Sequence, residues 1–178
     1  SVLEIADLKN SKDGFGVFGN YNSTGGQNFG FNLFNNQPVT YSSADKKWTY
    51  SPLKYWPTQG HIDFLAYAPR VDGTTLNGSS IEFTVADNAA DQKDLLWANA
   101  ENQTNANKPV SFTFNHALAK IGYTVKLKGA YSNATITLNK ITLAGSKDET
   151  TKAFYSKGTI DLATKITSPA TNPWTSTS

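Results

Sequence analysis

Histidine is the side chain on which most hydrolytic and zinc sites depend, and this chain contains two, His61 and His116. A hydrolytic triad needs a nucleophile, a histidine and an acid that converge, but the nucleophile motif Gly-x-Ser-x-Gly does not occur in the sequence. A zinc site would need about three or four clustered ligands. His116 follows an apolar run, which predicts a hydrogen-bonded structural role, and His61 follows Gln59-Gly60, so we expect it exposed in a turn. We predict no catalytic residue, no metal site and no cofactor.

Carboxylates offer two further kinds of chemistry, and neither has a sequence pattern behind it. The single acidic cluster consists of Asp87, Asn88, Asp91 and Asp94. Calcium takes roughly six to eight oxygen ligands from a tight loop, and the EF-hand pattern is missing here, so a calcium site stays an alternative to Asp94 anchoring the strand that follows it. Asp63 and Glu82 fall on different predicted strands, and nothing favours them as the acid pair of a glycosidase.

Aromatic side chains form the most credible binding site. The candidates for stacking on a sugar are Trp48, Tyr50, Tyr55 and Trp56. Flat rings on a β-sheet face can bind carbohydrate, but each ring also buries a large apolar area when it packs in a core. Pro52 and Pro57 surround Tyr55-Trp56 and favour an ordered turn packed against the sheet edge. The sequence leaves both interpretations open and favours packing.

The composition is that of one strand-rich domain outside the cytoplasm. The chain has 178 residues, with Phe 10, Tyr 8, Trp 4 and Gly 13, a balance typical of β-structure. Its net charge of +2 comes from mixed charges, which gives no basic stripe for nucleic acid or a membrane surface. The absence of cysteine excludes a disulfide scaffold and thiol chemistry. No apolar run approaches the ~18 residues of a membrane span.

Apolar spacing predicts the elements that would position these residues. A single apolar stripe predicts a short helix over residues 1–9. Period-two alternation predicts strands near 15–19, 29–33, 48–50, 62–68, 81–85, 110–114, 121–127, 136–143 and 160–162. Residues 62–68 are apolar on both faces, as in a central strand. A change of phase predicts a bulge near Asn139-Lys140, whereas 20–28, 87–94 and 99–109 are polar turns or loops and 168–178 is a tail.

These elements predict an all-β fold, an antiparallel β-sandwich of roughly seven to nine strands with at most one or two short helices. Six segments follow one another along residues 15–162. They are Phe-Gly-Val-Phe-Gly at 15–19, the segments 48–57, 62–69, 94–98 and 110–121, and Tyr-Ser-Lys-Gly-Thr-Ile-Asp-Leu at 155–162. In this order they resemble the fimbrillin-like family, which comprises the major fimbrial subunits, or type V pilins, of Bacteroides-type bacteria.

The resemblance implies a structural role in place of catalysis. It implies transthyretin-like sandwich domains, a lipoprotein precursor that is secreted to the cell outer membrane, and proteolysis after an Arg that removes a first strand. The opened groove would then accept a strand from the next subunit to build an extracellular fimbria that supports cell adhesion. Partners would be other fimbrial subunits, either copies of this chain or accessory pilins, and a host or bacterial surface protein or glycan.

The chain departs from the family pattern at both ends. It has no lipid-bearing N-terminal Cys and no obvious removable first strand, and family members usually continue into a second sandwich. We therefore expect 1–178 to be a single N-terminal fimbrillin-type domain, with 168–178 as a tail or a linker to a second domain. Either that domain lies outside this sequence or the chain is a short member of the family. A surface glycan-binding module that uses the four aromatic residues is the alternative function.

Overall fold

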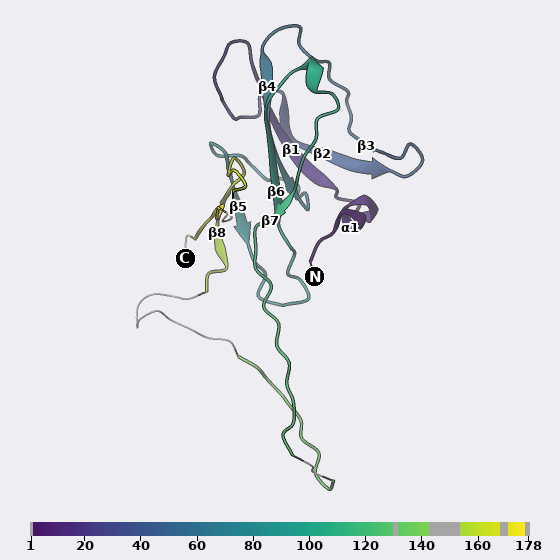
Figure 1. Cartoon of the computed structure of the whole chain (residues 1–178), viewed down its shortest axis with the longest axis vertical. Coiled ribbons are helices and arrows are strands. Elements are labelled where there is room, and N and C mark those ends of the chain that lie inside the picture. The colour runs from purple at the N-terminus through teal and green to yellow at the C-terminus, as the bar shows by residue number, and fades with distance from the viewer. Residues whose placement is uncertain (1, 130–131, 143–153, 168–170, 177–178) are drawn as a thin grey trace.

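The structure, a computed structural model, is built from two antiparallel sheets, and it describes residues 2–129, 132–142, 154–167 and 171–176 (Figure 1). The elements in these ranges are α1 (Ile5–Asn10), β1 (Phe15–Asn22), β2 (Phe34–Ser42), β3 (Lys47–Thr49), β4 (His61–Ala68), β5 (Ser80–Thr84), β6 (Leu96–Gln103), the 3-10 turn η1 (Asn105–Asn107), β7 (Asn115–His116), β8 (Lys157–Asp161) and β9 (Trp174–Ser176). The larger sheet has the order β3-β2-β1-β4-β6-β7, and the smaller has the order β5-β8-β9. The predicted all-β sandwich is confirmed.

Strand β4 is the centre of the larger sheet, as the sequence predicts for residues 62–68. It pairs with β1 on one side and with β6 on the other, and all eight of its residues are buried. Because successive side chains of a strand point to opposite faces, Phe64 and Ala66 enter one core, whereas Leu65 and Tyr67 enter the other. A strand that serves two cores needs apolar residues at both parities, which explains why its sequence lacks polar alternation.

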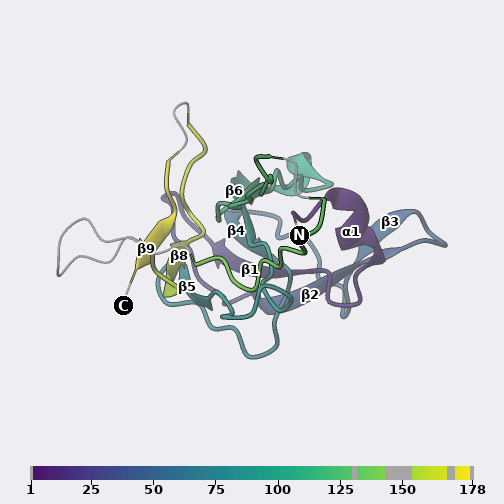
Figure 2. The same ribbon diagram turned by 90° about the horizontal axis from the view of Figure 1, so that it is seen from below.

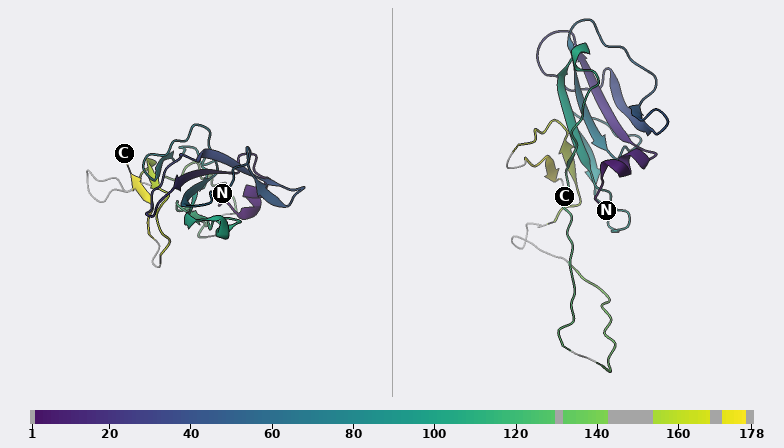
Figure 3. Two further views of the ribbon diagram at one scale, coloured as in Figure 1. Left: turned by 90° about the horizontal axis from the view of Figure 1, so that it is seen from above. Right: turned by 45° about the vertical axis from the view of Figure 1, so that its right-hand side comes forward.

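The smaller sheet closes the second core. Phe18, Leu65 and Tyr67 of the larger sheet pack there with Ile81 of β5 and Ile160 of β8. Figures 2 and 3 show β5, β8 and β9 lying together on one side of the larger sheet. The first core lies on the opposite face, where no second sheet is present among the described residues. Helix α1 and irregular segments cover that face instead.

The predicted strand at 29–33 is wrong, and β2 begins only at Phe34. The side chain of Asn32 explains the difference, because it bonds the backbone of β1 where a neighbouring strand would. Its Oδ1 accepts a hydrogen bond from Tyr21 N at 2.7 Å, and its Nδ2 donates to Tyr21 O at 3.0 Å. The amide satisfies these backbone groups locally, so residues 29–33 remain a loop despite their alternating apolar residues.

The predicted long loop at 99–109 is also wrong in its first half, because β6 continues to Gln103. The polar residue Asn99 of β6 has hydrogen-bond partners inside the sandwich. Asn99 Nδ2 donates to Leu162 O and to Thr164 O, each at 3.0 Å. A polar residue whose hydrogen bonds are satisfied fits an inner strand, and the sequence alone does not show those partners.

Three predicted strands after Pro109 are not formed in the described residues. Of the segment 110–116, only Asn115–His116 pairs as β7, and residues 121–127 and 136–142 are exposed and unpaired. Figure 1 shows 117–129 and 132–142 running away from both sheets. The predicted bulge near Asn139-Lys140 is therefore absent, and Leu143 lies outside the described residues. Alternation shows that a segment suits a sheet, but a ladder also needs a neighbouring strand.

The predicted end of the fold also differs. Residues 160–162 are not the last strand, because β9 lies within the predicted tail and pairs with β8, with Trp174 opposite Ile160. The N-terminal helix runs from Ile5 to Asn10, later than predicted, and buries Leu8. That 1–178 forms one domain with a linker at 168–178 stays a prediction.

Candidate functional site

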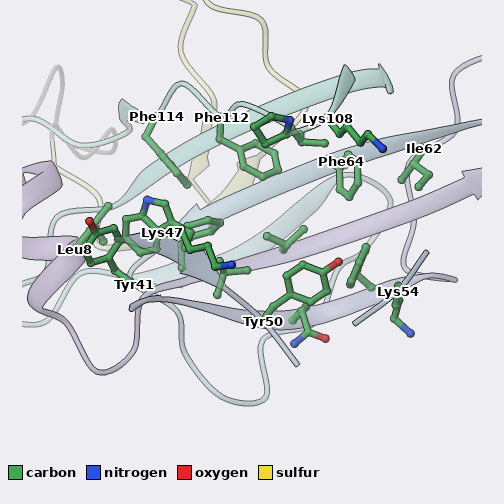
Figure 4. Close-up of a pocket in the computed structure, with 18 of the residues that line it drawn as sticks. Leu8, Tyr41, Lys47, Tyr50, Lys54, Ile62, Phe64, Lys108, Phe112 and Phe114 are labelled. Atoms are coloured by element: carbon green, nitrogen blue, oxygen red, sulfur yellow. The ribbon is translucent and has the colours of Figure 1, made fainter. Parts of the chain in front are cut away.

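A groove of about 810 Å³ lies on the face of the larger sheet that points away from the smaller sheet (Figure 4). Strands β1, β2 and β4 form its floor, with apolar side chains that include Val17, Phe34, Val39, Ile62 and Phe64. Helix α1, residues 46–56 and residues 108–114 form its walls. Its volume lies in the upper part of the range for ligand-binding pockets, about 300–1,000 Å³. We call this cavity the sheet groove.

The wall at 108–114 is an extended segment whose side chains face the groove. Val110, Phe112 and Phe114 are half-buried and line it, whereas Ser111 and Thr113 are exposed. The Phe112 ring lies 6.1 Å from the ring of Phe64 on the floor. Within the described part of the chain, residues 110–114 form no backbone-to-backbone hydrogen bond. This wall therefore has the side-chain pattern of a strand and an unpaired backbone.

The opposite wall contains all four aromatic candidates from the sequence, Trp48, Tyr50, Tyr55 and Trp56. Three of them are half-buried and pack edge-on against the floor or its surroundings. The ring centroids are 5.1 Å apart for Trp48 and Phe15, 5.5 Å for Tyr50 and Phe34, and 6.4 Å for Trp56 and Phe64. Tyr55 is 90% exposed. Packing thus occupies three of the four rings, while Tyr55 lies free at the rim.

Positive charge surrounds this apolar interior. Five lysines line the groove, Lys9, Lys46, Lys47, Lys54 and Lys108, and none of its lining residues is acidic. Lys9 Nζ lies 4.8 Å from the ring centroid of Tyr41, and Lys54 Nζ lies 5.7 Å from that of Phe34. Such cation–π contacts hold an ammonium group close to the ring face. The groove combines an aromatic interior with a cationic rim.

Residues 6–178 match the sequence model of the fimbrillin-like family. The chain belongs to the fimbrillin-like family. This is a family of structural pilins and not of enzymes, and it implies a cell-surface fimbrial subunit that assembles with other fimbrial subunits. No curated protein and no solved structure matches the chain.

Neither histidine of this fimbrillin-like chain lies in the sheet groove. The sequence predicts an exposed His61, but this residue is the first of β4 and is 7% exposed, with its Nε2 3.2 Å from Asp63 Oδ2. The prediction is wrong because β4 begins one residue after Gly60 and a buried carboxylate needs a partner. His116 is hydrogen-bonded, as predicted, through Nδ1 to Asp94 Oδ2 at 2.7 Å, although its side chain is 45% exposed.

Asp63 is the centre of a buried polar network that sequence reasoning missed. The residue is 1% exposed. Its Oδ2 accepts hydrogen bonds from Asn22 Nδ2 at 3.0 Å and Asn28 N at 3.1 Å, and its Oδ1 accepts one from Asn102 N at 2.8 Å. The donors come from two parts of the sequence that are both far from Asp63, residues 22–28 and residue 102, so no local motif reveals them. The carboxylate joins the loop after β1, the bulged end of β6 and the start of β4.

The acidic cluster at 87–94 does not converge. Asp94 Oδ2 accepts a hydrogen bond from Leu3 N at 2.9 Å and also lies 2.7 Å from His116 Nδ1, so this carboxylate is used within the protein. Asn88 Nδ2 donates a hydrogen bond to Asp91 Oδ2 at 3.4 Å. Glu82 lies on β5, in a different sheet from Asp63. Among the described residues, no group of three or more His, Asp or Glu is placed to hold a metal ion.

The described helices are also too short or too polar to cross a membrane.

Proposed function

We propose that this fimbrillin-like chain is a structural subunit of a bacterial surface fimbria and that its sheet groove receives a strand from a neighbouring subunit. The groove is the observation that carries this proposal. It is an apolar cavity over β1, β2 and β4, on a face that a second sheet would cover in a closed sandwich and that helix α1 and irregular segments cover here. A well-formed apolar cavity of this size on a folded protein is the usual place for a ligand or a partner segment to bind.

Strand addition suits the shape and the backbone of the groove. An added strand gains main-chain hydrogen bonds from an unpaired partner and specificity from pockets for alternate side chains. The segment 110–114 supplies unpaired backbone groups, and the floor supplies the apolar surface. A strand that passes head-to-tail between subunits does not close into a ring, so the assembly grows as a filament.

Family membership supports the finer parts of this proposal. The subunit would be made as a lipoprotein precursor, secreted to the outer membrane, matured by proteolysis and displayed on the cell surface, where the fimbria supports adhesion. Its sandwich would be of the transthyretin-like type. The chain would itself catalyse no reaction.

The absence of cysteine allows a direct test, because an introduced thiol is unique. Tyr55→Cys places that thiol on the rim of the groove at an exposed position, so a maleimide-polyethylene glycol group attached there obstructs the groove without entering the core. Leu53→Cys is the matched control, because Leu53 is 72% exposed and does not line the groove.

We expect the modified Tyr55→Cys protein to form no fibres, as seen by electron microscopy, under conditions in which the modified Leu53→Cys protein assembles. Circular dichroism of both proteins checks that they remain folded. Normal fibres from both modified proteins would contradict a role of the groove in assembly.

A second candidate function is a surface glycan-binding module, and one observation favours it. The Tyr55 ring is 90% exposed at the rim of an aromatic groove, and a free ring face can stack on a sugar. A glycan array tests this function with the unmodified protein and with Tyr55→Ala. Sugar binding that Tyr55→Ala abolishes would support the module, and an array without any binding would reject it.

A further inference from the structure

The lysines of the sheet groove indicate which kind of strand it accepts. We propose that the occupant is an extended segment of a partner subunit that has alternating apolar side chains in its middle and carboxylates towards both ends. This inference rests on the proposed function and specifies the chemistry of the partner at the same site. It combines the charge of the rim with the unpaired backbone of residues 110–114.

The rim carries positive charge at both ends of the groove. In Figure 4, Lys47 lies towards the end marked by Leu8 and Tyr41, and Lys54 and Lys108 lie towards the end marked by Ile62 and Phe64. All five rim lysines are exposed. Across the described ranges none of them forms an ion pair. Carboxylates of a bound segment would meet an ammonium group at either end.

The neighbouring carboxylates of the chain are directed to their own turns. Asp7 Oδ2 accepts a hydrogen bond from Glu4 N at 2.8 Å, and Asp45 Oδ2 accepts one from Ser42 Oγ at 2.8 Å. Neither residue lines the groove. A cluster of one sign around a low-dielectric cavity attracts ligands of the opposite sign and speeds their association.

Charge also argues against one obvious occupant, the segment 117–142 of a second copy of this chain, which we call the arm. Residues 117–142 include exposed Ile121, Tyr123 and Val125, but their charged residues are Lys120, Lys126, Lys128 and Lys140, without any acidic residue. Like charges brought together across an interface oppose binding. The groove therefore selects against this arm and in favour of an acidic segment.

The backbone of 110–114 argues for a peptide over an acyl chain with an acidic head group. Both ligands would fill an apolar groove with a cationic rim, but only a peptide has N–H and C=O groups to pair with this segment. Val110, Phe112 and Phe114 face the groove at every second position, the spacing of a strand. A strand that pairs with this segment presents its own alternate side chains to the same apolar floor.

The test uses two synthetic peptides that have the same alternating Val-Thr middle, one with Glu at both ends and one with Lys at both ends. Binding to the full chain is measured by fluorescence polarisation of the labelled peptides. We expect the acidic peptide to bind about tenfold more tightly at low salt, which is the effect of about two exposed ion pairs. This difference should shrink as salt screens the charges.

Two protein variants locate the effect. Lys54→Glu combined with Lys108→Glu should remove or reverse the preference for the acidic peptide. Lys12→Glu combined with Lys128→Glu makes the same change in net charge at exposed positions outside the groove and should leave the preference unchanged.

Methylation of the peptide backbone tests the pairing. In a strand, alternate N–H groups point to opposite edges, so N-methylation of one alternate set should weaken binding at least about tenfold, and methylation of the other set should have little effect. Equal effects of the two sets would overturn pairing with residues 110–114.

The outcomes separate this inference from the proposed function. Equal affinity for the two peptides would overturn the choice by charge and leave the groove as a strand acceptor. Binding of a long-chain fatty acid without binding of either peptide would overturn the inference and assign the groove to lipid. A third outcome is that neither peptide binds, although the protein forms fibres and the modification at Tyr55 blocks them. That result would reject an acidic segment as the occupant and leave the fimbrial role intact.

Discussion

Replacement of Asp63 should be one of the most destabilising single changes at a polar residue of this chain. In Asp63→Ala, the backbone N–H groups of Asn28 and Asn102 lose their acceptor inside the protein. Asn22 is affected less, because its Nδ2 has further acceptors in Asn20 O and Asn28 O. Each donor that loses a buried acceptor costs about 1–3 kcal/mol, and His61 Nε2 loses Asp63 Oδ2 as its hydrogen-bond partner.

We therefore expect Asp63→Ala to lower the free energy of unfolding by about 3–5 kcal/mol, a large part of the ~5–15 kcal/mol that is typical of a domain. At about 2–4 °C per kcal/mol for a chain of this size, the melting temperature should fall by roughly 6–20 °C. Asp63→Asn should cost less, about 1–3 kcal/mol. With its amide oxygen in the place of Oδ2 it keeps the bonds from Asn22 and Asn28, and only Asn102 N loses its acceptor.

Urea denaturation followed by circular dichroism measures both variants. Asp72→Ala is the control, because its carboxylate is 94% exposed and pairs only with Arg70 at the surface, and we expect it to leave the midpoint unchanged. A loss below about 1 kcal/mol in Asp63→Ala would refute the reasoning, since it would mean that water replaces the carboxylate without cost. An Asp63→Asn variant as unstable as Asp63→Ala would also refute it.

Three further predictions concern packing and the arm. Gly16→Ala should lower stability by about 1–3 kcal/mol through overpacking, because a Cβ there would lie 2.5 Å from Tyr67 Cε1; an unchanged urea midpoint would contradict this. Trp174→Ala should cost about 1–3 kcal/mol, since the ring packs edge-on against Phe83 with centroids 6.4 Å apart, and faster proteolysis near β9 would accompany the loss. Deletion of Lys140 should leave the melting temperature unchanged, because 132–142 is exposed and unpaired; a fall of several degrees would show that a strand forms there.

The sequence predicts the fold best where apolar pattern and environment agree. Residues 62–68 are apolar at both parities over the length of a strand, which suits a strand buried on two faces, and β4 is placed correctly. The pattern fails where one side chain changes the pairing. Asn32 occupies the place of a neighbouring strand beside Tyr21, and Asn99 satisfies its amide across the sandwich. Neither effect can be read from local spacing.

The sequence predicts part of the candidate site. The aromatic residues are recognised by type and clustering, and three of them pack as the simpler interpretation expects. The lysine rim is not recognisable, because Lys9, Lys54 and Lys108 are far apart in the sequence and meet only through folding. The hydrogen-bond network of Asp63 cannot be predicted from the sequence for the same reason. Period-two spacing also overpredicts strands after Pro109, since it cannot show whether a neighbouring strand is present.

The positions of the smaller sheet's strands in the sequence determine when the second core can close. Its strands come from residues 80–84, 157–161 and 174–176, and among the described residues β8 is the one strand that pairs with β5. While the chain emerges from a ribosome or a translocation pore, Phe18, Leu65 and Tyr67 remain without their covering layer until nearly the whole sequence has passed through. Late formation of a core from segments far apart in the sequence is slow, and its intermediates expose apolar surface and are prone to aggregate. The newly made polypeptide should therefore depend on a chaperone for most of its passage, and truncation before residue 157 should yield an aggregating product.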